Sequence, residues 1–569
     1  MTADSMTTLD PVEVGIIWSR ISSIADEMVS ALVRTAFSTI VRESGDNSCM
    51  IFDGDARLLA QGAVSVPSFT GTGPHTLRQM LEQIPPESLE DGDVILTNDP
   101  WIGTGHVYDV NVVKPIFFNG RIVGYCLTVS HLSDVGGSGM GSGARDVFEE
   151  GFSLPPVKLF EAGKPSAFVF EFLRRNVRMP DLVLGDIYSN VASCNVGARG
   201  IIELLDEHGL DDTHAVAEAI YEQTRKAVQS KLEALPKGEF SAELRVEGGE
   251  TYPDVKLAVT VTITDGGFMF DFAGTGPVVR AGVNVPICYS RAFCYFCVKV
   301  LTAPNIPNNQ GILDFVSVTA PDDCLLNALR PHPTGARHVF GHFVAPLIFS
   351  AMEDVLPDVV QADSGMVFQV NMRGRSPAGR PYSFIYFSPG GYGALDGYDG
   401  RAALPGPSNM IGASIEVWEE QTGCMFLRKE VMPDTGGAGE FSGGNGQIIV
   451  MRNVSPGVIE GSFMASRTRL VANGFHGGRD GTARTIKVDG RTVDPRARVE
   501  LPVGGEIEIV DAGGGGFGGP AERCVEAIAA DLADGRITRA FAAEHYPAQL
   551  AELDKSEGPV GVKPTTSYS

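Results

Sequence analysis

The stretch from Asn98 to Leu132 decides the fold of this chain, and it reads NDPWIGTGHVYDVNVVKPIFFNGRIVGYCLTVSHL. Two runs rich in β-branched and aromatic residues flank Asn119-Gly120, and an Asn-Gly pair between such runs is the strongest short-range signal for a β-hairpin. A glycine-bearing loop precedes the first run, and a second glycine loop, residues 135–144, follows the second. The sequence therefore predicts an antiparallel hairpin whose open end is surrounded by irregular backbone.

The turn also sets the register of the hairpin. If Asn119-Gly120 is a two-residue turn, Phe118 pairs with Arg121, and counting back along both strands places His131 opposite Tyr108. His106 lies two residues from Tyr108 and shares its face, so it is a diagonal neighbour of His131 at about 7–8 Å between Cα atoms. Two imidazoles at that spacing can share one metal ion, because each bond from the metal to nitrogen is about 2.1 Å long.

The hairpin thus brings together two short motifs, His106-x-x-Asp109 and His131-x-x-Asp134. Asp109 pairs with Ser130 in this register and points to the opposite face, so a bend near residues 105–109 is needed to bring it to the histidines. With ten histidines in the whole chain, their meeting beside carboxylates is informative. The residues alone leave two interpretations open: a metal site for Zn, Mn or Fe, or ordinary sheet histidines with aspartates in turns.

A second group of carboxylates follows the first expected helix, residues 11–42. Glu43 and Asp46 stand in the segment ESGDNS. They are candidates for a further metal ligand or a base, and the alternative is an ordinary polar helix end.

Composition and charge exclude several classes of protein. The chain has 569 residues, 68 of them glycine, and a net charge of −25. Such a negative field repels phosphate backbones and anionic lipid surfaces, so we expect no nucleic-acid partner and no membrane partner. No run of about 18 apolar residues predicts a membrane-spanning helix, and the first residues show no signal peptide, so we expect a cytoplasmic protein.

Other motifs give weaker signals. The nine cysteines are odd in number and scattered, which argues against a disulfide framework. Cys294-Tyr-Phe-Cys297 lies in an apolar run and is better explained as part of a core helix or strand than as a redox or zinc site. The glycine loops at residues 136–143 and 513–519 are better explained by turns than by anion binding, since no phosphate-loop motif GxxxxGK followed by Ser or Thr occurs.

The pattern along the chain predicts an α+β protein with several domains. Residues 172–230 are mostly helical, whereas residues 239–273 and 446–512 alternate as short strands do. We expect a β-rich molecule with several mixed or antiparallel sheets and flanking helices. The predicted divisions are an N-terminal α+β domain with the metal site (1–235), a central α+β region (236–445), and a β-rich region ending in a glycine-rich loop and a helix (446–569).

Several ordered blocks of this sequence resemble the hydantoinase B/oxoprolinase family. Asn98 to Val110 is similar to the family's "NDP…GGTH…DV" block, His131 to Gly137 to its "HxxDIGG" block, and Glu149 to Leu159 to its "EG…PPVKL" block. Later blocks follow in the same order, among them NQG at residues 309–311 and GGGGFGG at residues 513–519. The resemblance extends over nearly the whole chain.

This resemblance implies a two-component, ATP-dependent enzyme. An A-type partner subunit would carry the nucleotide site, use ATP with Mg²⁺ and phosphorylate an oxygen of the substrate. The B-type subunit would hold a divalent metal, Zn or Mn with Fe as an alternative, and complete the reaction. We expect hydrolysis of a cyclic amide such as a hydantoin, 5-oxoproline or a lactam, in a hetero-oligomer such as a heterotetramer. The corresponding subunit of an acetone or acetophenone carboxylase is the alternative, and a scaffold subunit without a reaction centre is a third.

The resemblance also implies roles for individual residues. It places the metal on His106, Asp109 and His131, with Asp46, or alternatively Glu43, as a fourth ligand. Asp134 or Glu43 would accept a proton or orient a ligand imidazole.

Two positions depart from the family pattern. Phe69 stands where a "PxHxG" block has histidine, and Ser442 stands where a late "RGG" block has arginine. Both changes remove a polar or charged group, so a less polar substrate than 5-oxoproline is an option.

Overall fold

The hairpin lies at the centre of a seven-stranded antiparallel sheet in the computed structural model, which describes residues 10–557. The strand order is β2-β1-β5-β4-β3-β6-β7. The bounds are β1 Asn47–Asp53, β2 Leu58–Gln61, β3 Val94–Thr97, β4 Asp109–Phe118, β5 Arg121–His131, β6 Val157–Glu161 and β7 Lys164–Pro165. Asn119 and Gly120 adopt φ angles of 49° and 75°, as a type I′ turn requires, and Phe118 pairs with Arg121. The turn and the hairpin are confirmed.

The register of the hairpin differs from the predicted one along most of its length. A β-bulge between Ile116 and Phe117 leaves Val123 without a partner, and every pair beyond it shifts by one residue. Asp109, rather than Tyr108, therefore stands opposite His131. Because directly opposed residues of an antiparallel pair share a face, the bulge moves Asp109 to the side of the histidine, and the bend expected near residues 105–109 is not what brings it there.

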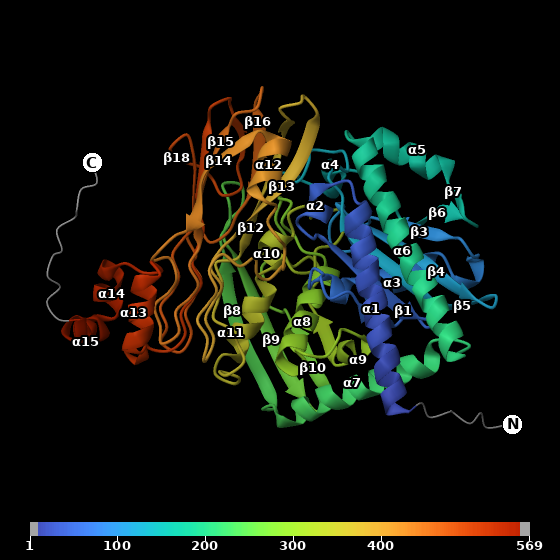
Figure 1. The fold of residues 1–569 in the computed structure, drawn as a ribbon, viewed down its shortest axis with the longest axis horizontal. Helices are drawn as coiled ribbons and strands as arrows, with labels where there is room; N and C mark the ends of the chain where they lie inside the picture. The colour runs from blue at the N-terminus through green and yellow to red at the C-terminus, as the bar shows by residue number, and fades with distance from the viewer. Residues whose placement is uncertain (1–9, 558–569) are drawn as a thin grey trace, which may run out of the picture.

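Two long helices cover one face of this sheet. Figure 1 shows α1 and α6 lying side by side in front of the strands. Asp10 caps α1 by accepting a hydrogen bond from the N–H of Val12 at 3.1 Å, and Pro11 occupies the first helical position. On the other face α3 packs against α8, and Gly73 of α3 lies against Met50 of β1. The helices of this half are α1 Pro11–Thr35, α2 Thr39–Arg42, α3 Phe69–Gln83, α4 Val147–Glu150, α5 Ala167–Asn176, α6 Pro180–His208, α7 His214–Ala234 and α8 Ile287–Thr302.

A mixed four-stranded sheet follows, in the order β11-β10-β9-β8. β10 pairs with β11 in parallel, and the other pairs are antiparallel. Its strands and the helices near it are β8 Gly238–Val246, β9 Val255–Thr264, β10 Gly267–Asp271, β11 Val316–Thr319, α9 Gln310–Leu313, α10 His338–Gly341 and α11 Val344–Met352. α11 packs on β8 and β9, and Cys294 and Cys297 are buried in α8 as core residues.

The last two sheets share one core. One has the order β13-β12-β16-β19 and the other β14-β15-β20-β17-β18, and apolar residues from both, such as Phe368, Phe463 and Ile507, form a single cluster. The strands are β12 Val367–Arg375, β13 Pro381–Pro389, β14 Cys424–Val431, β15 Gln447–Asn453, β16 Ile459–Met464, β17 Thr485–Val488, β18 Arg491–Thr492, β19 Arg498–Leu501 and β20 Glu506–Val510. The remaining helices are α12 Ile415–Thr422, α13 Val525–Ala533, α14 Arg539–His545 and α15 Pro547–Glu557.

The glycine-rich segment 513–519 forms part of a stack of backbones. A Cβ on Gly513 would stand 1.7 Å from the carbonyl oxygen of Thr435, so only glycine fits there. The backbone N–H groups of Gly514, Gly515 and Gly516 donate to other backbone carbonyls. These amides already donate hydrogen bonds within the protein, so they are not free to bind an anion. The structure therefore favours packed turns, rather than an anion-binding loop, as the explanation of this segment.

The predicted fold class is confirmed: the protein is α+β and β-rich, with antiparallel and mixed sheets and flanking helices. Pairing of β12 with β16 crosses the predicted boundary at residue 445, and the three-part division stays a prediction. Within residues 10–557 no helix has the length and apolar character needed to cross a bilayer.

Candidate metal centre

Three side chains converge where the hairpin opens. The Nε2 atom of His106 lies 2.8 Å from Oδ2 of Asp109, and Nδ1 of His131 lies 3.2 Å from Oδ1 of the same carboxylate. The two imidazole rings are 5.2 Å apart between centroids, and one donor atom from each of the three residues lies within 4.8 Å of the others. The structure thus brings together the three predicted ligands at the open end of β4 and β5.

The donor set fits a divalent metal. Two imidazole nitrogens and a carboxylate oxygen are ligands that Zn, Mn and Fe all accept. Burial, together with the charge of Arg337, lowers the pKa of His106 to about 3, so its ring is neutral at neutral pH and keeps a lone pair for a metal. Burial would raise the pKa of Asp109, but hydrogen bonds from the two histidines and the charge of Arg337 hold it well below its usual range.

Asp46 stands beside this triad and Glu43 does not line its cavity. The Oδ2 atom of Asp46 is 3.6 Å from Nδ1 of His131, and its backbone carbonyl accepts the N–H of His131 at 3.2 Å. Burial raises the pKa of Asp46 to about 6, against the lowering effect of His131. Glu43 ends α2 and is half-buried. Of the two carboxylates expected near the metal, the structure places Asp46 in the cavity.

Asp134 is engaged elsewhere. Its Oδ1 atom accepts from Nη1 of Arg178 at 2.8 Å and from the N–H of Gly136 at 3.1 Å, and the backbone N–H of Arg178 bonds its other oxygen. These contacts tie the glycine loop to the segment before α6. Asp134 does not line the cavity around the triad. In the structure it forms an ion pair with Arg178 and is not beside the candidate metal ligands.

Arg337 completes the surroundings of Asp109. Its Nη2 atom lies 3.0 Å from Oδ2 of Asp109, its Nε donates to the carbonyl of Thr104 at 2.7 Å, and its guanidinium lies 4.1 Å above the ring of Tyr289. Gly105 is needed here, because its φ is 95° and a Cβ would stand 2.7 Å from the Arg337 side chain. Arg337 was not predicted from the sequence, because the spacing of residues along the hairpin contains no information about a segment that follows it by about 200 residues. The histidines of RHVFGH, residues 337–342, were the available signal.

The loop that carries Arg337 is held by a buried acid. The Oε1 atom of Glu150 accepts the backbone N–H groups of Thr334 at 2.8 Å and Gly335 at 2.6 Å. Burial raises the pKa of Glu150 to about 8 although these N–H groups lower it. Glu150 lies in one of the blocks on which the family resemblance depends, and its contacts give that block a structural role.

A small cavity surrounds the triad. The space between its side chains amounts to about 370 Å³, part of it open to solvent, and about 30 Å³ of it has room for whole water molecules. Apolar residues form one part of the wall, and these are Val66, Phe69, Met140 and Met410. Polar residues form the rest, namely Ser68, His338, His342, Gln369 and Ser408, together with the triad, Asp46, Tyr289 and Arg337. Phe69, which stands where the "PxHxG" block of the family pattern has histidine, therefore lines the same cavity as the triad.

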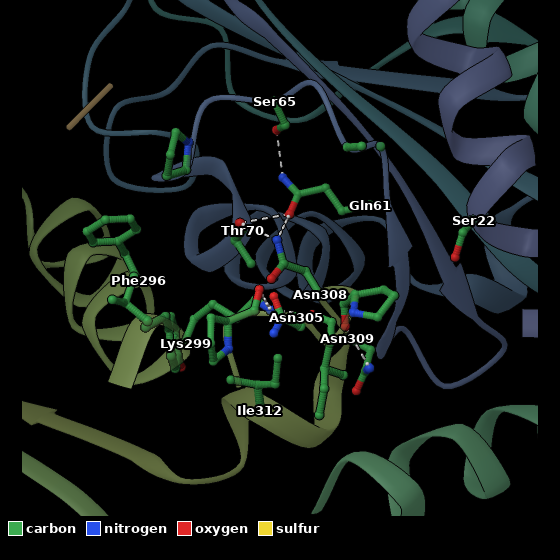
Figure 2. A pocket seen from close by; sticks show the side chains of 18 of the residues that line it. Ser22, Gln61, Ser65, Thr70, Phe296, Lys299, Asn305, Asn308, Asn309 and Ile312 are labelled. Atoms are coloured by element: carbon green, nitrogen blue, oxygen red, sulfur yellow. Dashed lines mark hydrogen bonds between the residues drawn. The ribbon is translucent and has the colours of Figure 1, made fainter. Parts of the chain in front are cut away.

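A larger cavity of about 440 Å³ adjoins it. Figure 2 shows its wall, in which Gln61 is central: Gln61 donates to Ser65 at 2.7 Å and accepts from Thr70 at 2.7 Å and from Asn308 at 2.9 Å. The ammonium of Lys299 donates to three backbone carbonyls, including that of Pro304 at 3.2 Å. The two cavities share segments, since residues 65, 67 and 70 line the larger one and residues 66, 68 and 69 line the smaller one.

Comparisons with known proteins agree with the sequence resemblance. The family model for hydantoinase B/oxoprolinase matches residues 10–520. A protein of Pseudomonas sp. (strain NS671), provisionally named as the B-type subunit of a D-/L-hydantoinase, is 28% identical over 96% of this chain and 96% of its own length. The beta chain of the caprolactamase of Pseudomonas jessenii is 26% identical over 94% of this chain and 95% of its own. The fold is also that of a nucleotide-free acetone carboxylase chain, with a TM-score of 0.87 at 17% identity, over 97% of this chain and 84% of that one.

Proposed function

Because the chain belongs to the hydantoinase B/oxoprolinase family, we propose that it is the metal-dependent B-type subunit of an ATP-dependent cyclic-amide hydrolase. Its substrate would be a hydantoin, 5-oxoproline or a lactam that an A-type partner subunit has phosphorylated. The observation that carries the proposal is the convergence of His106, Asp109 and His131 on one buried point. The names of the relatives as subunits support a partner, and so does the lack of a phosphate-loop motif in this sequence.

The division of labour follows from amide chemistry. An amide carbon is a poor electrophile, and phosphorylation of its oxygen by the partner makes the carbon open to attack by water. His106, Asp109 and His131 would hold a divalent ion, and such an ion would supply a Lewis acid that lowers the pKa of water towards neutrality. The ring C–N bond then breaks and its nitrogen leaves as the amine. Breaking this bond leaves an acyl phosphate, and a second water hydrolyses it to the carboxylate and inorganic phosphate. One ATP and two water molecules are therefore used for each ring opened.

Asp46 is the residue we assign to the proton of the attacking water. It lies in the cavity beside His131, where a carboxylate can reach a water held in the cavity. This role replaces the place as fourth metal ligand expected for it, because the close group of donor atoms comprises His106, Asp109 and His131. Asp134 is bound to Arg178 and Glu43 lies outside the cavity wall, so this assignment takes the place of the roles expected for them.

The assembly and location are proposed with the function. We place the chain in a hetero-oligomer with the A-type subunit, such as a heterotetramer, in the cytoplasm. ATP and Mg²⁺ act through that subunit, and Zn or Mn, with Fe as the alternative, occupies the triad.

A second candidate function is the corresponding step of a ketone carboxylase. The likeness in fold to acetone carboxylase favours it, as does the apolar part of the cavity wall. A ketone would take the place of the amide, and bicarbonate would supply the carbon that is added.

The test supplies the chain with its A-type partner, ATP and Mg²⁺, and offers cyclic amides and ketones with and without bicarbonate. We expect ring opening of at least one cyclic amide, with release of phosphate and no need for bicarbonate. Turnover of a ketone that depends on bicarbonate, with no ring opening, would overturn the proposal in favour of the carboxylase. A purified chain without divalent metal, in a complex whose activity survives His106→Ala, would favour a scaffold role.

A further inference from the structure

Two polar side chains of the small cavity have no partner within the protein. Both ring nitrogens of His338 are buried without a hydrogen bond, and so is Oε1 of Gln369. His338 is 3% exposed and Gln369 is 7% exposed. Both residues line the cavity that contains the triad, although they come from α10 and β12, which are far apart in the sequence.

Unpaired groups of this kind are costly. A buried donor or acceptor without a partner destabilises a protein by about 1–3 kcal/mol, so native structures leave few of them, and each needs an explanation. Gln369 lies in the middle of a paired strand and His338 in a helical turn, so neither side chain is a frayed end. A ligand that bonds to both would remove the cost.

The chemistry of the pair specifies the ligand. A neutral imidazole offers one N–H donor and one acceptor, and a glutamine oxygen is an acceptor only. We infer that His338 and Gln369 form a recognition site for the amide group of the substrate ring: the imidazole N–H donates to the amide oxygen, and Oε1 of Gln369 accepts the ring N–H. Phosphorylation of that oxygen leaves the proton on nitrogen as an iminium N–H, so both contacts are available to the free and to the phosphorylated ring. A small ring holds its amide in the cis form, which presents oxygen and N–H on the same side. This inference rests on the proposed function and names the group by which the substrate is chosen.

The remaining wall suits the rest of such a ring. Val66, Phe69, Met140 and Met410 offer apolar contacts to methylene groups. The space is narrow, and the two methionines are the side chains that can move to admit a ring, because methionine is unbranched and adapts to irregular gaps. A ketone has no N–H for Gln369, so the site distinguishes amides from ketones.

His338 serves better as a substrate contact than as a further metal ligand. The group of donor atoms that lie within 4.8 Å of one another comprises His106, Asp109 and His131 and does not include His338. Its nearest aromatic neighbour in the cavity is His342, at 5.7 Å between ring centroids. His338 and the triad line the same cavity, so a ligand in that cavity has both on its wall.

Equilibrium binding tests the inference without turnover. The full-length chain as purified, with its metal content measured in each sample, is titrated calorimetrically with ε-caprolactam, N-methylcaprolactam and cycloheptanone. We expect the lactam to bind about tenfold more tightly than the other two, because each lacks the N–H that pairs with Gln369. Gln369→Met should remove this preference and leave the metal content unchanged.

Variants of His338 probe the other half of the site. His338→Phe should weaken all three ligands about tenfold, because each has a carbonyl oxygen, and His338→Gln should restore part of the binding by returning a donor. Gln447→Met is the matched control, since Gln447 is a glutamine with 4% exposure in β15 outside the cavity. It should leave the order of affinities unchanged.

Equal binding of lactam and cyclic ketone to the unaltered chain would overturn the inference, and so would absence of lactam binding. Loss of metal in His338→Phe would overturn it as well, because His338 would then be a ligand. Failure of the proposed function has a different signature. In that case the lactam preference and its loss in Gln369→Met persist, but no cyclic amide is opened when the partner and ATP are supplied.

Discussion

The two neighbouring cavities differ in size and in chemistry, and the smaller one contains more groups that could bind a metal or a substrate. The larger one, about 440 Å³, has a wall whose central polar side chain, Gln61, bonds to other wall residues. The smaller one has about 30 Å³ for water, yet it contains the candidate metal triad and the unpaired atoms of His338 and Gln369. In the larger cavity the amide of Asn308 still donates to Gln61, and its Oδ1 atom is the buried wall atom without a partner. In the smaller one His338 has no partner at either ring nitrogen, so its whole polar group is available to a ligand. The candidate metal triad thus lies in the smaller of the two cavities, and volume alone would have selected the other one.

The largest expected effect comes from the triad itself. Asp109→Asn should lower metal affinity and turnover at least about 100-fold. Substitution of residues that only hydrogen-bond to metal ligands already lowers metal affinity or activity about 10–100-fold. Metal analysis and steady-state rates of the complex with its partner check this. Asp93→Asn is the control, because Asp93 is equally buried, pairs with Lys158 and lies outside both cavities. Full metal content in Asp109→Asn would place the metal elsewhere.

Arg337→Met should have the next largest effect. Removing the guanidinium leaves Asp109 with fewer partners, and we expect metal affinity to fall about 10–100-fold. A titration of the metal-free chain with Mn²⁺ measures it. Arg330→Met is a control, because Arg330 also pairs with an aspartate and stacks on an aromatic ring, Trp101, but lies outside the cavity wall. An unchanged affinity in Arg337→Met would show that the arginine acts on the substrate alone.

The sequence predicted that His106 and His131 lie close together, because the Asn119-Gly120 turn fixes which two strands pair, although the register that the turn sets extends only as far as the bulge. It could not predict the bulge at Ile116 and Phe117, which moved Asp109 to the side of His131, because either strand can accept an extra residue. Arg337 and Gln369 reach the cavity from later segments, and spacing along the hairpin contains no information about them. For the same reason the sequence could not predict that Asp134 bonds to Arg178, which lies 44 residues away.

Phe69 tests whether the apolar wall selects the substrate. Phe69→His adds a polar group next to the triad, and we expect kcat/KM for an unsubstituted lactam to fall about tenfold relative to that for 5-oxoproline. Rates with both substrates, in the complex with the partner, measure the ratio. Phe69→Leu should leave the ratio nearly unchanged. If both variants change the ratio of kcat/KM values equally, the size of the side chain determines the selectivity and its polarity does not.

Glu150 connects the wall of the small cavity to the stability of the fold. Its pKa in the folded chain is raised by burial to about 8, whereas the unfolded chain ionises near the ordinary value. The protonated acid therefore stabilises the fold fully below that ordinary value, and the contribution is lost as the pH rises towards 8. Glu150→Gln keeps a neutral side chain, so its Tm should exceed that of the unaltered chain by about 2–4 °C at pH 8 and match it near pH 4. Thermal unfolding at several pH values measures the difference, and an equal gap at every pH would refute the titration of Glu150 as its cause.

The smallest effect is expected in the larger cavity. Asn308→Ala removes a side chain whose Nδ2 donates to Gln61 at 2.9 Å and to Thr70 at 3.3 Å. These bonds join parts of the wall to one another, so we expect kcat and KM with a cyclic amide to change less than about twofold and the Tm to fall by about 2 °C. Steady-state rates and thermal unfolding separate the two quantities. A loss of turnover as large as that of Asp109→Asn, with normal metal content, would show that the larger cavity holds the reacting substrate. The unpaired groups of the small cavity would then need a different ligand.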